Sequence, residues 1–241
     1  MVGGSVLNGI LIDNAESLVD LPERSATFWR KSLLRAQDSL VKYGITAMTD
    51  AGLSTKNILI LDSLQEEGKF SLFVNAMIAH TESDLQYFEE HGPILKNLLR
   101  VQSVKAYLDG ALGSRGALLR APYHDLPEHY GLPLLAPEEL DNLRDRCLKN
   151  NWQLCVHAIG DSAHRILLKS FYTLDTTSDL RFRVEHAQIM TPEDSVYYSH
   201  PNIVASIQPT HATSDMYWAE TRLGSHRLKH AYSFKRILNA S

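Results

Sequence analysis

The 241-residue chain has little cysteine and no long apolar run. Its two cysteines, Cys147 and Cys155, fall in a predicted helix and a predicted strand, and two such thiols are too few for a disulfide framework. We therefore expect a reducing compartment. No run of about 18 apolar residues occurs, so no membrane helix is expected. Residues 1–4 also lack the pattern of a secretory signal, and the expected location is the cytoplasm, with no membrane partner.

An excess of basic residues is also missing. Lysine and arginine total 24 against 28 aspartate and glutamate residues, which gives a net charge of −4. Such a chain lacks the basic surface that nucleic acid requires, so no nucleic-acid partner is expected and a small-molecule partner is favoured. Hydrophobic residues make up 44% of the chain, enough for a substantial core. The length fits one α/β barrel-sized domain or one to two smaller domains, and because internal repeats and a clear linker are absent, we expect one domain over residues 1–241.

Short apolar segments alternate with segments of helical periodicity along most of the chain. This rhythm is typical of an α/β fold with parallel strands. Strands are predicted near residues 45, 71, 101, 153, 181 and 203, with an extended segment at 9–15. Helices are predicted over 25–43, 56–67, 82–90, 137–150, 163–174 and 226–239, with another start at 191–194. Residues 109–133 have no periodicity, and a connection of that length is usually functional or mobile.

Two of the predicted strands end on histidines, His157 and His186. In a barrel of parallel strands these ends share one face, which is where sites are built. A single histidine there is more often structural, but several on one face favour a metal, since neutral imidazole is a common ligand. His164 is expected on the exposed side of the next helix. Other polar residues at the strand ends are Asp50, His80, Lys105, Asp109 and His211.

Lys105 lies inside an otherwise apolar predicted strand. A buried cation is costly unless it is neutralised or paired. Two chemistries use such a lysine: a Schiff base with a carbonyl substrate, or capture of CO₂ as a carbamate that bridges two metals. The nearby histidines favour the carbamate. The alternative is a structural lysine whose side chain reaches the rim or pairs with Asp109.

Four motifs carry a family resemblance. Residues 104–115, 156–161, 183–188 and 208–215 resemble the amidohydrolase superfamily, in particular the amidohydrolase 3 group, and are similar to N-substituted formamide deformylase. The resemblance implies a (β/α)₈ TIM-type barrel that holds metal at its strand ends. It also implies a metal-dependent hydrolase that acts through metal-activated water on a carbon–nitrogen bond other than a peptide bond, in an amide or formamide-like small molecule.

The resemblance also implies roles for individual residues. His157 and His186 correspond to metal ligands, and Lys105 to the position that can be carboxylated, so these three form the expected catalytic and metal-binding set. The implied cofactor is a divalent metal, with zinc expected and iron, manganese or cobalt compatible with the same ligands. Four further residues are expected to line the substrate pocket: Asp109, Ser114, Arg115 and His211. The alternative for Asp109 and Arg115 is a pair that stabilises the loop.

The chain also departs from the family pattern. It has no His-x-His motif, and the late aspartate in a Gly-Ser-Asp context is missing. We therefore expect an incomplete barrel, strands two to seven of the parent fold, truncated at both ends. Open sheet edges favour association, so a homo-oligomer is expected. The alternative to an enzyme is a non-catalytic scaffold or binding protein that lacks the ligands of the first and last strands.

Overall fold

The computed structural model describes residues 18–177 and 179–240, and six parallel strands form its sheet. In spatial order these are β1 (Ala47–Leu53), β2 (Phe73–Ala79), β4 (Leu99–Tyr107), β5 (Gln153–Ala158), β6 (Phe182–His186) and β7 (Ile203–Ser206). A two-residue strand, β3 (Ile94–Leu95), pairs antiparallel with β4. The predicted parallel α/β architecture is confirmed. The extended segment expected at 9–15 lies outside the described residues.

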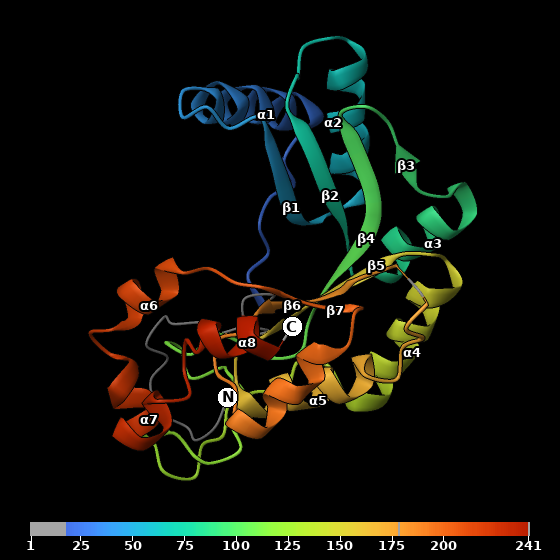
Figure 1. The fold of residues 1–241 in the computed structure, drawn as a ribbon. Coiled ribbons are helices and arrows are strands. Elements are labelled where there is room, and N and C mark those ends of the chain that lie inside the picture. Colours follow the sequence, from blue (N-terminus) through green and yellow to red (C-terminus); the bar gives the residue numbers. More distant parts are fainter. Residues whose placement is uncertain (1–17, 178, 241) are drawn as a thin grey trace.

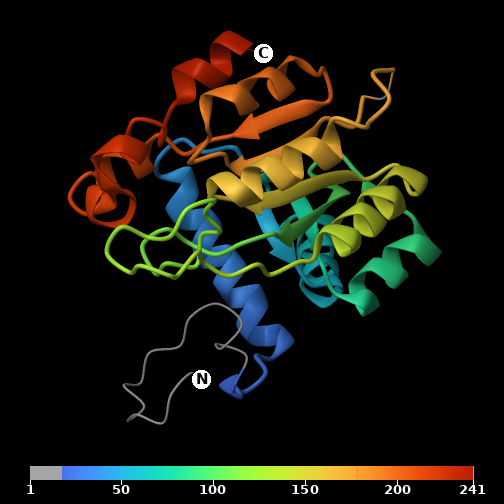
Figure 2. The ribbon, with the colours of Figure 1, turned by 90° about the horizontal axis from the view of Figure 1, so that it is seen from below.

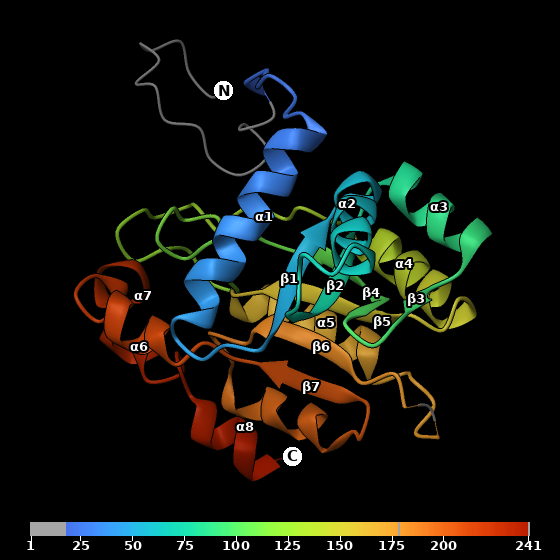
Figure 3. The same cartoon turned by 90° about the horizontal axis from the view of Figure 1, so that it is seen from above.

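The sheet is curved but open. In the described part of the chain, β1 and β7 each pair on one side alone, so the strands do not close into a ring. Seen from above, the strands follow one another from β1 to β7 in chain order (Figure 3). Figure 1 shows β1, β2 and β4 standing above β5, β6 and β7. The expected incomplete barrel is therefore confirmed.

One α-helix precedes β1, and one follows each of the first four parallel strands, as the periodicity predicts. Their bounds are α1 (Ala26–Val41), α2 (Thr55–Glu66), α3 (Glu82–His91), α4 (Pro137–Lys149) and α5 (Asp161–Phe171). Ser25 caps α1, because its hydroxyl accepts the Phe28 N–H at 3.2 Å. Proline at the first position of α4 loses no helical hydrogen bond, which favours a helix start there.

The last third of the chain differs from the sequence-based expectation. The helix predicted from 191–194 is the 3₁₀ helix η2 (Pro192–Ser199), and the one predicted over 226–239 is two helices, α7 (Ala219–Leu228) and α8 (Phe234–Ala240). The break lies at Tyr232, whose φ of 54° is left-handed and whose N–H donates to the Gln188 carbonyl at 2.7 Å. A six-residue helix, α6 (Thr210–Asp215), was not predicted.

Two hydrophobic clusters hold these elements together. The larger one lies between the outer face of the sheet and the helices, and strand alternation sends Val156 and Val184 into it. The smaller one lies under the 109–133 loop and joins Tyr123 of that loop to Leu223 of α7. Figure 2 shows this light-green loop beside the red α6–α7 segment. Both cysteines are buried and unbridged. Among the described helices, none is both long and apolar enough to cross a bilayer.

Candidate active site

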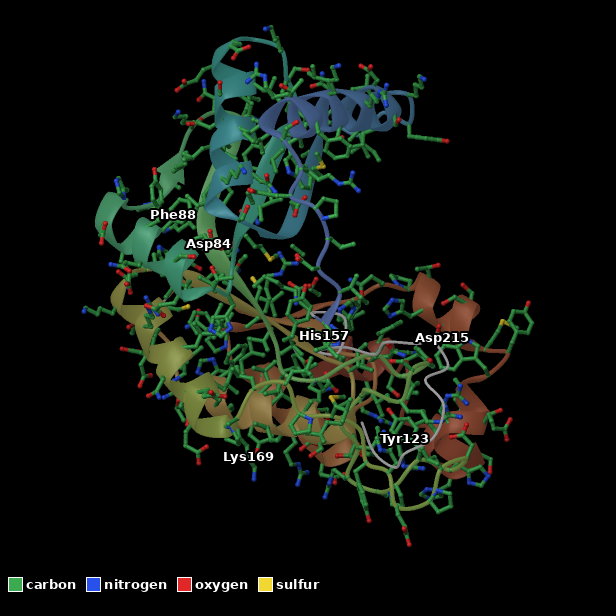
Figure 4. All side chains as sticks on the ribbon, turned by 180° about the vertical axis from the view of Figure 1, so that it is seen from behind. Asp84, Phe88, Tyr123, His157, Lys169 and Asp215 are labelled. Atoms are coloured by element: carbon green, nitrogen blue, oxygen red, sulfur yellow. The ribbon has the colours of Figure 1, made fainter. Side chains whose placement is uncertain are left out.

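The imidazole rings of His157 and His186 meet at the carboxyl ends of β5 and β6. These strands are neighbours, and Ala158 pairs with His186 in their parallel register. The two ring centroids lie 4.5 Å apart in an edge-to-face arrangement. Strict alternation would turn His186 away from His157, but φ values of 74° at His186 and 44° at Ala187 redirect the chain. The structure therefore brings the predicted histidine pair together. Figure 4 shows His157 near the centre of the molecule.

Hydrogen-bond acceptors fix which nitrogen of each ring carries a proton. His157 Nε2 lies 3.3 Å from the Gly110 carbonyl oxygen, so it donates and leaves the Nδ1 lone pair free. His186 Nδ1 lies 2.8 Å from the Gln208 side-chain oxygen, so it donates and leaves Nε2 free. Each imidazole therefore keeps one nitrogen that can bind a metal.

Burial keeps both histidines neutral. It lowers the pKa of His157 to about 3, with further lowering from the adjacent His186 and the Lys105 charge. Burial also lowers the pKa of His186, and here too the charges of neighbouring His211 and Lys105 act in the same direction. Neutral imidazole is the form that binds metal, so the pair is in the required state at neutral pH.

Lys105 lies beneath these histidines on β4. Lys105 is 4% exposed, so it does not reach the rim, which one of the two structural alternatives supposed. The ammonium donates to the Ala106 carbonyl at 2.9 Å and lies 3.5 Å from the centroid of the Tyr107 ring. Burial lowers the pKa of Lys105 to about 8, against the opposing pull of the Glu185 carboxylate. Near neutral pH, a fraction of the molecules therefore carries Lys105 as the neutral amine that carbamate or Schiff-base chemistry needs.

Asp109 is fully buried, and its carboxylate contacts the protein's own backbone. It accepts the N–H groups of Leu118 at 2.8 Å, Ile159 at 3.0 Å and Gly160 at 2.8 Å. One of its oxygens also lies 3.5 Å from His157 Nε2. These bonds join the start of the long loop to the turn that follows His157. They favour the loop-organising alternative for Asp109, although its partner in that role is backbone and not Arg115.

The other residues of the predicted pocket separate into two places. Arg115 pairs with Asp125 at 2.8 Å inside the loop, and Ser114 is exposed, with its hydroxyl donating to the Ala111 carbonyl at 3.2 Å. His211, by contrast, stacks on His186 with ring centroids 5.5 Å apart and an interplanar angle of 18°. The structure thus gathers His157, His186 and His211 and leaves the two loop residues apart; a substrate contact for each remains a prediction.

The expectation for His164 is wrong. This side chain is fully buried, with Nδ1 3.0 Å from the Ile189 carbonyl oxygen and Nε2 2.7 Å from the Tyr198 hydroxyl. The reason is the position of η2, which places Tyr198 against the face of α5 that would otherwise meet water. His164 is a structural residue of the core.

Sequence reasoning missed several side chains beside the histidines. Gln208 orients His186, and the Tyr107 ring lies 5.6 Å from the His157 ring and against Lys105. Arg183 and Glu185 form an ion pair of 2.9 Å on β6, on the same face as His157. Period-two alternation from Lys105 and from Arg183 is the signal that could have placed Tyr107 and Glu185 on this face.

The side chains present match part of a metal site. Among the described residues, no group of three histidine, cysteine or acidic side chains is close enough to hold a metal. Two neutral imidazoles with free nitrogens are available, and a carbamate on Lys105 would add oxygen ligands of the kind divalent metals accept. A hollow of about 700 Å³ lies at the opposite ends of the strands and is lined by Asn75, Arg100, Gln102 and Ser103 among others. It is not part of this site.

A sequence profile of the amidohydrolase family matches residues 2–241. The chain belongs to the amidohydrolase family. Protein LONG AFTER FAR-RED 3 of Arabidopsis thaliana is 32% identical to this amidohydrolase chain over 265 residues, covering 100% of the chain and 46% of that protein. The putative amidohydrolase YtcJ of Bacillus subtilis (strain 168) is 26% identical over 238 residues, covering 96% and 45% respectively.

A comparison with solved structures also finds a hydrolase. The crystal structure of an uncharacterized metal-dependent hydrolase from Pyrococcus horikoshii OT3 is similar to this amidohydrolase chain with a TM-score of 0.83 and 28% identity. The similarity covers 94% of this chain and 46% of that one. The chain therefore spans about half the length of the relatives it matches. Family membership and the partial-barrel fold, both expected from the motifs, are confirmed.

Proposed function

We propose that this chain is part of a metal-dependent hydrolase that cleaves a carbon–nitrogen bond other than a peptide bond, in a small amide or formamide-like substrate. The observation that carries the proposal is the His157–His186 pair, with ring centroids 4.5 Å apart and one free nitrogen on each ring. Membership of the amidohydrolase family supports the hydrolytic chemistry. Similarity to a metal-dependent hydrolase supports the metal.

Each side chain has a role in this proposal. His157 would hold a divalent metal through Nδ1 and His186 through Nε2, and zinc, iron, manganese and cobalt all accept imidazole. Bound there, such a metal would lower the pKa of water from ~15.7 to ~7 and polarise the substrate carbonyl. Neutral Lys105 would attack CO₂ through Nζ and release a proton, which leaves a carbamate. His211, stacked on His186, would contact the substrate.

Two other functions have one observation each in their favour. The lowered pKa of Lys105, about 8, favours a Schiff-base lyase, and borohydride trapping with a carbonyl substrate would then leave a covalent adduct on Lys105. The unpaired edges of β1 and β7 in the described part of the chain favour a non-catalytic scaffold or binding protein. Such a scaffold could self-associate through the open edges of β1 and β7.

Metal content measured by elemental mass spectrometry tests the proposal. The chain purified with zinc available should retain metal, and the His157→Ala/His186→Ala double variant should lose it. His91→Ala is the matched control, because His91 is exposed at the end of α3 and bonds only locally to the Tyr87 carbonyl at 2.8 Å. Equal metal in all three proteins would contradict the assignment. Metal in none of them would favour the scaffold.

A further inference from the structure

Three side chains from separate segments of the chain, Gln188, Asp215 and Tyr232, form hydrogen bonds with one another at the end of α6. The Gln188 amide donates to Asp215 Oδ2 at 3.0 Å, and the Tyr232 hydroxyl donates to the same oxygen at 2.8 Å. The Gln188 nitrogen also lies 3.1 Å from the Tyr232 hydroxyl oxygen. Figure 4 labels Asp215 on its helix. Gln188, Asp215 and Tyr232 are called the Asp215 cluster below.

Two side chains of the cluster are buried, and Tyr232 is half-buried. Gln188 is 2% exposed and Asp215 is 9% exposed. A buried carboxylate is costly without donors, and Asp215 has a third one in the Ser214 hydroxyl at 2.8 Å. Burial and the adjacent Asp215 charge raise the pKa of Tyr232, so its hydroxyl stays protonated and donates. Three donors on one carboxylate hold the Asp215 side chain in a single orientation.

The cluster connects two of the three histidines of the site. His211 and Asp215 lie four residues apart on α6 and therefore share one face of that helix. Six residues are too few for a helix to be stable alone, so α6 depends on its tertiary contacts. Gln188 follows His186 by two residues. Pinning Asp215 to Gln188 therefore fixes His211 relative to His186, on which its ring stacks at 5.5 Å.

Two residues in or next to the Asp215 cluster have a strained backbone. His186 and Tyr232 adopt φ values of 74° and 54°, which residues other than glycine seldom adopt. The Tyr232 N–H donates to the Gln188 carbonyl at 2.7 Å and holds the two segments side by side. Strained backbone persists where surrounding contacts enforce it, and such residues cluster at functional sites.

We propose that the Asp215 cluster positions the His211 imidazole against His186 and thereby makes His211 part of the reaction site. The proposal rests on the metal-dependent function proposed above. Asp215, Gln188 and Tyr232 are positioning residues in it, because they act through His186 and His211 and touch no reacting atom.

The test compares Tyr232→Phe with Tyr198→Phe. Each change removes one tyrosine hydroxyl that bonds to a buried side chain, and the Tyr198 partner is His164, outside the site. Two quantities are measured: the affinity of the full chain for Co²⁺ by visible spectroscopy, and the nuclear Overhauser effect between the His186 and His211 ring protons in the metal-free chain. Tyr232→Phe should weaken Co²⁺ binding on the order of tenfold and reduce the ring-to-ring signal. Tyr198→Phe should lower only the unfolding temperature.

Two further variants protect the test against misfolding. Asp215→Asn keeps the side-chain shape and an acceptor oxygen, so its effects should be smaller than those of Asp215→Ala. Unchanged Co²⁺ affinity and an unchanged ring-to-ring signal in folded Tyr232→Phe and folded Asp215→Ala would overturn the proposal. If the unmodified chain binds no Co²⁺, the metal-dependent function fails. The ring-to-ring signal then decides by itself whether the cluster positions His211.

Discussion

His186 Nδ1 and the Gln208 side-chain oxygen lie 2.8 Å apart. The glutamine comes from the segment after β7 and the histidine from the end of β6, so the bond ties two strand ends together. Because Gln208 holds the proton on Nδ1, it leaves Nε2 as the free nitrogen of His186.

Replacement of Gln208 by leucine should weaken metal binding without unfolding the chain. The change removes the acceptor for the His186 proton, and loss of such a partner typically lowers metal affinity on the order of 10–100-fold. Gln208→Glu keeps an acceptor and should retain binding. Gln86→Leu, on the exposed side of α3, is the control. Competition with a chelator measures each affinity, and equal values for Gln208→Leu and the control would refute the role.

Lys105 should take up CO₂ more readily as pH rises through about 8, because burial lowers its pKa to about 8 and the neutral amine is the reactive form. With ¹³C-labelled bicarbonate, a carbamate signal should appear in the carbon NMR spectrum and metal occupancy should increase. Lys105→Ala should abolish the signal and regain part of its metal occupancy with short carboxylic acids. Lys169→Ala, which alters an exposed lysine, should behave like the unmodified chain. Insensitivity to bicarbonate would make Lys105 a structural residue.

His164 should make the chain acid-sensitive. Burial lowers its pKa from 6.5 to about 4 in the folded state. Between these values the unfolded state binds more protons, so the free energy of unfolding should fall by on the order of 3 kcal/mol as pH is lowered from about 6.5 to about 4. His164→Gln should flatten this fall in urea titrations at several pH values. His157, whose pKa is lowered to about 3, keeps part of the slope. An identical slope in His164→Gln would show that His164 does not titrate in this range.

Gly160→Ala should loosen the 109–133 loop. A Cβ at this position would lie 2.0 Å from the Leu118 carbonyl oxygen, so the loop backbone must move away from the turn after His157. Overpacking of this kind typically costs about 1–3 kcal/mol. Thermal unfolding measures the loss of stability, and limited proteolysis should show earlier cleavage within the loop. Gly44→Ala is the control: its φ of 74° strains alanine, but nothing lies within 4 Å. Early loop cleavage in both variants would contradict the explanation.

The parallel strands and most helices could be predicted because their signals are local. Apolar runs of strand length mark β5 and β6, and parallel strand ends that share one edge place His157 and His186 at the same end of the sheet. The contact between their rings depends on the left-handed backbone at His186 and Ala187, which alternation does not predict. The family motifs add the fold and the chemistry. The predictions that were wrong concern features that depend on tertiary contacts. His164 is buried only because η2 packs on α5, and the helix predicted over 226–239 breaks because Tyr232 bonds to Gln188.

The polar residues of the long loop show the same limit. Asp109 and Arg115 are six residues apart, and a mutual pair is a natural guess. The loop instead folds back, so that Asp109 accepts backbone N–H groups from the turn after His157 and Arg115 reaches Asp125. The contacts of Gln208 and of the Asp215 cluster likewise depend on how the segments after β6 and β7 pack on each other. The periodicity of the sequence does not predict that packing.

The parallel strands lie in the sheet in the same order as in the chain, so the sheet can form by adding one strand after another. Apart from the short β3, each parallel strand pairs with the parallel strand before it in the chain, so every addition closes a single crossover connection. During synthesis a new strand can dock on an edge that already exists, from β1 onward. The His157–His186 pair then forms only when β6 reaches β5. The two rings can therefore approach each other only after both of these strands have joined the sheet.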